Sequence, residues 1–156
     1  DAHWNPYPIQ PPLRMGEIEM RALHIPMRDG TKIAVDVFLP RQRNANAKFP
    51  AILQATRYFR RSKYRQPFQN WMWEQKLIAQ RYFLANGYAW VGIDARGTGA
   101  STGHWAAPWT EAELTDYAEV MDWIIRQSWS DGTLGATGVS YNGTAAEMMA
   151  KSPPNS

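Results

Sequence analysis

The chain has 156 residues, of which 44% are hydrophobic, so it is long enough to form one domain around a buried core. Its net charge of +3 is too small to indicate a nucleic-acid or membrane partner unless the basic residues are concentrated in one patch. The absence of cysteine excludes disulfides, thiolate metal sites and a cysteine nucleophile within these residues.

Residues 1–16 are rich in proline and predict an extended arm that lies over the body of the protein. The chain begins with Asp1 and Ala2 rather than with methionine, which fits a processed secreted or periplasmic protein as well as a trimmed piece. Export is favoured slightly over a cytoplasmic location. No signal peptide is visible, and no apolar run approaches the length of a membrane span, so no membrane partner is expected.

The next residues predict a β-hairpin followed by alternating strands and helices. Strand-like residues 17–26 and 32–40 flank a turn at residues 28–30, Arg-Asp-Gly. The further predicted elements are strands over residues 50–56, 88–94 and 135–139 and a helix over about 70–86. This order is typical of an α/β fold with a mostly parallel sheet, helices on its faces and an N-terminal antiparallel hairpin.

A second helix is predicted from its start signal. Thr110 and Glu113 have the spacing of a capping box, in which each residue satisfies a free backbone N–H of the first turn. Apolar side chains then recur at helical spacing from Leu114 to Ile125. The preceding helix is expected to end at Gly87, because glycine readily adopts the left-handed conformation of a C-terminal cap.

Residues 138–143, Gly-Val-Ser-Tyr-Asn-Gly, have the pattern of a nucleophile elbow, a sharp turn between a strand and a helix. A β-type run precedes the motif and an alanine-rich helical run over residues 144–150 follows it. Such a turn exposes the serine hydroxyl, and the N-terminus of the following helix stabilises the oxyanion that forms on attack. Ser140 is therefore predicted to be the nucleophile of an acyl-transfer reaction.

The residues after Ser140 do not complete a catalytic triad. In α/β-hydrolases the triad follows the chain order Ser, Asp or Glu, then His. No histidine or aspartate follows Ser140, and Glu147 is the sole acid there. The three histidines lie upstream, at His3, His24 and His104. We interpret residues 17–156 as the N-terminal portion of an α/β-hydrolase catalytic domain that is incomplete and inactive alone. His24 is expected to be structural, and His104 is not expected to be the base, because it would break the chain order typical of the fold.

Three stretches besides the elbow carry further motifs. Residues 26–32 read Pro-Met-Arg-Asp-Gly-Thr-Lys, residues 94–103 read Asp-Ala-Arg-Gly-Thr-Gly-Ala-Ser-Thr-Gly, and Tyr58 follows the strand that ends near Thr56. Together with Gly-x-Ser-Tyr-x-Gly they resemble the cocaine esterase and X-prolyl dipeptidyl-peptidase family (S15, CocE/NonD), which also includes α-amino acid ester hydrolases. The resemblance extends in order and spacing over residues 17–155.

This resemblance implies a serine hydrolase that cleaves an ester or amide bond through an acyl-enzyme on Ser140. Two groups are implied as donors to the oxyanion, the hydroxyl of Tyr58 and the backbone N–H of Tyr141. Arg57 occupies a position where the family often has proline. The triad Asp and His are expected outside this chain, in the remaining C-terminal part of the hydrolase, which is the expected partner.

The expected substrate is a small-molecule ester or a peptide, with an X-Pro dipeptide or an α-amino acid ester as variants of the same chemistry. In this family the acyl pocket is shaped largely by segments that follow the elbow, so the substrate-binding residues stay unassigned. No metal or organic cofactor is expected. Trp71 and Trp73 are interpreted as core residues rather than as lining of an acyl pocket.

Two segments have features of a binding site, but a structural interpretation is favoured for each. Residues 97–99, Gly-Thr-Gly, follow a strand as in a dinucleotide site, but the third glycine of that fingerprint is misplaced. The favoured prediction is a scaffold loop held by a pair between Asp94 and Arg96. A basic, aromatic segment could bind nucleic acid, although a solvated loop is favoured and no nucleic-acid partner is expected. Its basic residues are Arg57, Arg60, Arg61, Lys63 and Arg65.

A function of another class also remains open. The chain could be a hydrolase-like binding module that has no complete triad, which its length of 156 residues favours. The intact elbow argues against this alternative, because a binding module has no physical need for an activated serine. Association into a homo-oligomer is also left open.

Overall fold

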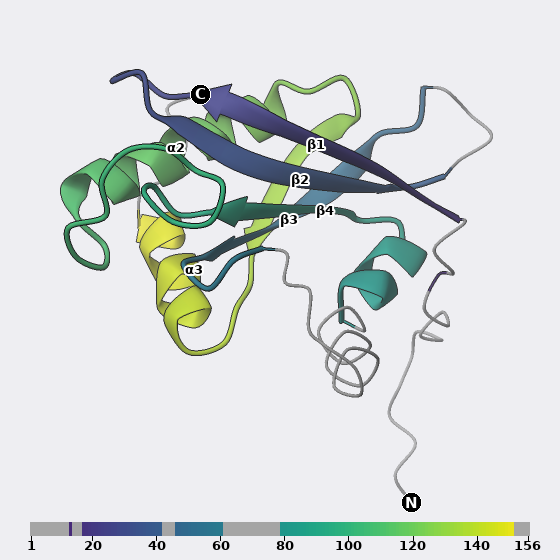
Figure 1. Ribbon diagram of the computed structural model, residues 1–156. Helices are drawn as coiled ribbons and strands as arrows, with labels where there is room; N and C mark the ends of the chain where they lie inside the picture. Colours follow the sequence, from purple (N-terminus) through teal and green to yellow (C-terminus); the bar gives the residue numbers. More distant parts are fainter. Residues whose placement is uncertain (1–12, 14–16, 42–45, 61–78, 152–156) are drawn as a thin grey trace, which may run out of the picture.

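The computed structural model describes Leu13 and residues 17–41, 46–60 and 79–151 (Figure 1). Within these residues the chain forms a five-stranded sheet with the order β1-β2-β4-β3-β5. The strands are β1 (Ile18–Pro26), β2 (Lys32–Pro40), β3 (Phe49–Thr56), β4 (Ala89–Asp94) and β5 (Ser130–Ala136). β2 pairs antiparallel with β1 and β4, whereas β3 pairs parallel with β4 and β5. The predicted α/β fold with an N-terminal antiparallel hairpin is confirmed.

Helices cover both faces of this sheet. Helices α2 (Glu111–Ile125) and α3 (Tyr141–Lys151) pack on the face that includes Val91, through buried side chains such as Tyr117 and Ala145. The helix whose described part is residues 79–85 packs on the other face, where Leu84 contacts Trp90. Neighbouring residues of β4 thus enter different layers, as the alternation of a β-strand requires. In the described part of the chain, no helix combines the length and hydrophobicity needed to cross a bilayer.

The predicted strand limits agree with the observed ones to within one residue, except at β5. That strand was expected over residues 135–139 but spans Ser130–Ala136. Its first half contains Asp131 and Gly132, which are poor strand formers, and its pairing with β3 changes register between Phe49 and Ala51. Pairing with the edge of β3, rather than local propensity, therefore determines where β5 begins. Most of the predicted arm and the first part of the predicted helix over 70–86 lie outside the described residues.

The loop after β4 is held by a different set of ion pairs from the one predicted. Asp94 accepts hydrogen bonds from the Arg60 side chain and from the Ala100 backbone N–H, the latter at 3.0 Å. Arg96 instead donates to Asp116 at 2.6 Å and to Asp29 at 3.0 Å. The predicted pair of Asp94 with Arg96 is therefore wrong, because β4 ends at Asp94 and the following turn directs Arg96 towards α2. The scaffold role predicted for this loop fits these contacts.

Candidate active site

Ser140 lies at the turn between β5 and α3, with a backbone φ of 58°. This left-handed conformation is uncommon for a residue other than glycine and often marks a functional turn. The Ser140 carbonyl accepts hydrogen bonds from the N–H groups of Gly143 and Thr144, at 2.9 and 3.0 Å. Because the residue is exposed and immediately precedes α3, it has the geometry that a nucleophile elbow requires.

Two glycines allow this turn to close. A Cβ atom on Gly138 would lie within 3.0 Å of the Asn142 backbone, and one on Gly143 would lie 3.2 Å from the Gly138 carbonyl oxygen. A common elbow has its second glycine two residues after the serine, where this chain has Asn142. In this turn it is Gly143 that approaches the Gly138 carbonyl, so the second glycine stands one position later than in the common elbow.

Tyr58 lies in the segment after β3 and reaches the residue that follows Ser140. The Tyr58 and Tyr141 ring centroids are 5.9 Å apart, with the rings edge to face. The Tyr58 side chain is exposed, and its backbone N–H donates to Thr56 Oγ1 at 3.0 Å. The structure therefore brings Tyr58, Tyr141 and Ser140 to the same corner of the sheet, while their catalytic roles stay predictions.

Arg57 lies among aromatic rings in this corner. Its guanidinium carbon is 4.8 Å from the ring centroids of both Tyr58 and Tyr141 and 5.5 Å from that of Trp105. Its Nη2 donates to the Tyr58 hydroxyl oxygen at 2.8 Å. Arg57, which stands where the family often has proline, thus contacts Tyr58, the predicted oxyanion donor.

The solvated basic loop predicted around Arg57 is wrong at Arg60, although Tyr58 and Phe59 are exposed. The Arg60 side chain is 14% exposed and forms ion pairs with Asp36, at 3.1 Å, and with Asp94. No acid lies near Arg60 in the sequence. Its two partners come from β2 and β4, so only the fold brings them to Arg60. The remaining basic residues of the segment, and Trp71 and Trp73, lie outside the described residues.

A buried carboxylate, Glu113, links α2 to the elbow. Its Oε1 accepts hydrogen bonds from the hydroxyls of Tyr117 and Tyr141, and its Oε2 accepts from the backbone N–H of Trp109 at 2.8 Å. The Glu113 N–H donates to Thr110 Oγ1 at 3.4 Å, as predicted for the capping box. The carboxylate, however, does not accept from the Thr110 backbone N–H, as a complete capping box would, but accepts from the hydroxyls of the two tyrosines. Sequence reasoning missed this second role, since only the fold brings Tyr141 to α2.

Burial raises the pKa of Tyr141 above its ordinary value of 10.0, and the hydrogen bond to Glu113 raises it further. Burial likewise raises the pKa of Tyr117, with the negative charge of Glu113 as the second cause. Both groups are therefore neutral hydroxyls that donate to the carboxylate over the whole range in which esterases are usually assayed.

The raised pKa values of Tyr117 and Tyr141 predict that the protein loses stability in alkaline solution. In the unfolded chain both tyrosines ionise near pH 10, but in the folded protein they stay protonated, so their contribution is complete below pH 10 and declines above it. Urea unfolding between about pH 8 and about pH 11 measures the decline. Tyr117→Phe should make the decline shallower, and an unchanged slope in this variant would contradict the assignment.

Neither described histidine joins Ser140. His24 lies in β1 with its Nε2 3.0 Å from the Ala100 carbonyl oxygen, in agreement with the structural role predicted for it. His104 is exposed in the loop between β4 and α2. Within the described part of the chain, neither forms a hydrogen bond with Ser140, and no group of three or more potential metal ligands is placed to bind an ion. His3 lies outside the described residues.

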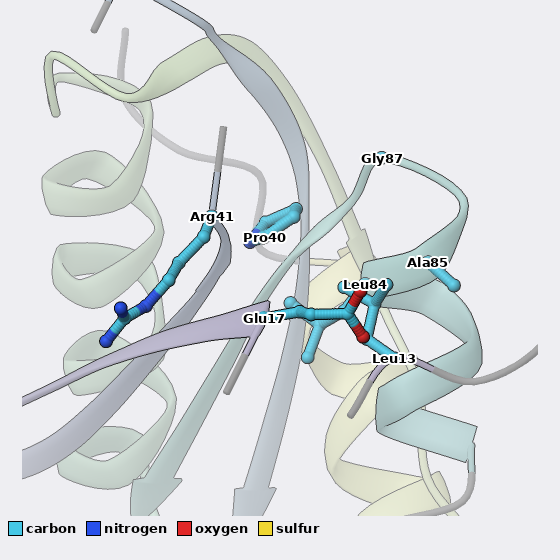
Figure 2. Close-up of a pocket in the computed structure, with 7 residues that line it drawn as sticks. All are labelled: Leu13, Glu17, Pro40, Arg41, Leu84, Ala85 and Gly87. Carbon is cyan, nitrogen blue, oxygen red and sulfur yellow. The ribbon is translucent and has the colours of Figure 1, made fainter. Parts of the chain in front are cut away.

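A cavity of about 370 Å³ lies at the end of the sheet opposite Ser140 (Figure 2). It is found where β1 begins, where β2 ends and where the chain turns before β4. Its lining consists of Leu13, Glu17, Pro40, Arg41, Leu84, Ala85 and Gly87. Because Ser140 follows the other end of β5, this cavity does not belong to the candidate active site.

Comparisons with known proteins identify relatives over most of this chain. The chain is 41% identical to a protein of Mycobacterium bovis described as a candidate serine esterase, over 96% of this chain and 25% of that protein. It is 34% identical to the cocaine esterase of a Rhodococcus strain, over 82% of this chain and 20% of the esterase. The chain thus spans a quarter or less of the length of these curated relatives.

A solved structure shows the same fold. A CocE/NonD family hydrolase of Staphylococcus aureus superposes with a TM-score of 0.61 and 27% identity, over 79% of this chain and 23% of the hydrolase. The sequence model of the S15 family, X-Pro dipeptidyl-peptidase, matches residues 29–156, which include the loop after β4 and the elbow. The chain therefore belongs to the X-Pro dipeptidyl-peptidase (S15) family.

Proposed function

We propose that this chain carries the nucleophile and the oxyanion-binding groups of a serine hydrolase that cleaves esters or amides. The observation that carries the proposal is the exposed Ser140 at a left-handed turn between β5 and α3, with Tyr58 and Tyr141 beside it. No Asp or His follows Ser140 in these 156 residues, so the other two triad members come from outside this chain.

In this mechanism a histidine accepts the proton of Ser140 while the serine oxygen attacks the carbonyl carbon of the substrate. A C–O bond forms and the carbonyl oxygen becomes an oxyanion. Collapse of this intermediate expels the alcohol or amine, which takes a proton from the histidine, and water then hydrolyses the acyl-enzyme. Ser140 is regenerated in the second half of the cycle.

The oxyanion is stabilised by the Tyr58 hydroxyl and by the backbone N–H of Tyr141, the residue after the nucleophile. One such donor contributes about 10²- to 10³-fold to the rate. Support for this pair comes from the way Tyr141 is fixed: its hydroxyl donates to Glu113, and its ring stacks on Trp109 with centroids 5.0 Å apart. The N-terminus of α3 adds a favourable partial positive charge.

An ester is the first choice of substrate, because the relatives that match most of this chain at the higher identities are described as esterases. Amides of X-Pro dipeptides are the second choice, supported by the family match and by a candidate Xaa-Pro dipeptidyl-peptidase of Bacillus anthracis, 30% identical over 79% of this chain. An α-amino acid ester is a third variant, and a binding module without catalysis is the alternative from another class.

A fluorophosphonate probe tests the proposal, since it labels only a serine with an activated hydroxyl. The full-length protein that contains this chain, with its intact mass established under denaturing conditions, should be labelled once, on the peptide that carries Ser140. Ser128, which is exposed on the turn before β5, is the internal control and should stay unlabelled. Absence of labelling at Ser140, or equal labelling of Ser128, contradicts the hydrolase and favours the binding module.

A further inference from the structure

Arg57 has an unusual environment for a cation beside a candidate oxyanion site. Its guanidinium lies over three aromatic rings, those of Tyr58, Tyr141 and Trp105. The described residues include no carboxylate that forms an ion pair with it, in contrast to Arg60 and its two aspartates. Aromatic faces hold a cation without neutralising it, so the positive charge of Arg57 persists next to the elbow.

The hydrogen bond between Arg57 and Tyr58 has only one possible direction. A guanidinium group has no acceptor, so Arg57 Nη2 donates and the Tyr58 hydroxyl oxygen accepts, at 2.8 Å. The phenolic proton of Tyr58 is therefore left for another acceptor. A charged donor on the oxygen also polarises the O–H group, which strengthens the hydrogen bond that this group donates in turn.

We propose that Arg57 is a positioning residue for the reaction, which directs and strengthens the Tyr58 hydroxyl as the donor to the oxyanion. The inference rests on the proposed function, because it needs an oxyanion formed by attack of Ser140. Arg57 acts on the transition state through Tyr58, so its effect appears in kcat and not in KM for a neutral ester. The aromatic rings hold the guanidinium in the place where it reaches the phenol oxygen.

A double-mutant cycle in the full-length protein tests the inference, with p-nitrophenyl butyrate as the neutral ester. Arg57→Gln should lower kcat by about 10-fold, as expected for loss of a charged hydrogen bond, with KM changed less than about 2-fold. In the Tyr58→Phe background the same substitution should have no further effect, because the oxygen that accepts from Arg57 is absent. Arg126→Gln is the matched control, since the side chain of Arg126, the C-cap residue of α2, is 70% exposed, and this substitution should leave kcat unchanged.

Several outcomes overturn the inference. Equal losses from Arg57→Gln with and without the Tyr58 hydroxyl show that Arg57 does not act through Tyr58. A rise in KM confined to esters that carry a carboxylate, with kcat unchanged, shows that Arg57 binds substrate instead. If Arg57→Gln does not fold, as judged by thermal unfolding, Arg57→Lys replaces it, because lysine keeps the positive charge and a long side chain. The effect of Arg57→Lys on kcat should likewise disappear in the Tyr58→Phe background.

The proposed function fails in a distinguishable way, namely hydrolysis that persists in Ser140→Ala or is absent from the wild-type protein. Hydrolysis that requires Ser140 but shows no coupling between Arg57 and Tyr58 overturns only the further inference.

Discussion

Ser140→Ala should abolish ester hydrolysis, with a fall in kcat of about 10⁵- to 10⁶-fold, while the protein remains folded. Ser140 is exposed and its hydroxyl forms no hydrogen bond within the described part of the chain, so alanine removes the nucleophile and little else. The backbone strain is unchanged, because serine and alanine both place a Cβ atom at the φ of 58°. The measurements are kcat for a neutral ester and the thermal unfolding midpoint.

Tyr58→Phe provides the comparison, since it removes one proposed oxyanion donor but keeps the ring that meets Tyr141 edge to face. Its kcat should fall by about 10²- to 10³-fold, less than in Ser140→Ala. Tyr88→Phe is the control, because Tyr88 lies just before β4 at the opposite end of the sheet and packs on Phe83. Equal losses in Ser140→Ala and Tyr58→Phe contradict the separate roles of nucleophile and oxyanion donor.

The features that could be predicted from the sequence are those determined by neighbouring residues. The elbow is one of them, because the strand, the two glycines, Ser140 and the following helix all lie within one short segment. The hairpin of β1 and β2 is another, since its alternation and its turn are local. Such features need no knowledge of what the rest of the chain packs against.

The ion pairs could not be predicted, because their partners are brought together only by the sheet. Arg60 joins aspartates of β2 and β4, while Arg96 reaches Asp116 on α2. Burial raises the pKa of Asp116, and the hydrogen bonds from Arg96 oppose this shift. A short spacing such as that of Asp94 and Arg96 suggested a pair, but the end of β4 separates the two side chains. Sequence proximity is therefore a poor guide to buried charges in this fold.

Glu113→Ala should destabilise the protein by about 3–5 kcal/mol, the loss expected when one partner of a buried polar network is removed. Glu113 is fully buried, and its carboxylate accepts hydrogen bonds from the hydroxyls of Tyr117 and Tyr141 and from the backbone N–H of Trp109. Alanine leaves these donors without their acceptor and opens a cavity. Urea unfolding at neutral pH measures the loss.

Two further variants separate the buried network from the general effect of an acid in the first turn of α2. Glu111 is exposed in that turn and shares the favourable interaction with the helix dipole, so Glu111→Ala should cost only about 0.3–1 kcal/mol. Glu113→Gln keeps an oxygen for the tyrosines but presents an amide NH₂ group to the backbone N–H of Trp109, so its loss of stability should lie between those of the two alanine variants. If Glu113→Ala is no less stable than Glu111→Ala, the carboxylate does not hold the elbow to α2. If the predicted order is found, the backbone N–H of Tyr141 owes its position to an acid outside the elbow motif, and Glu113→Gln should lower kcat as well as stability.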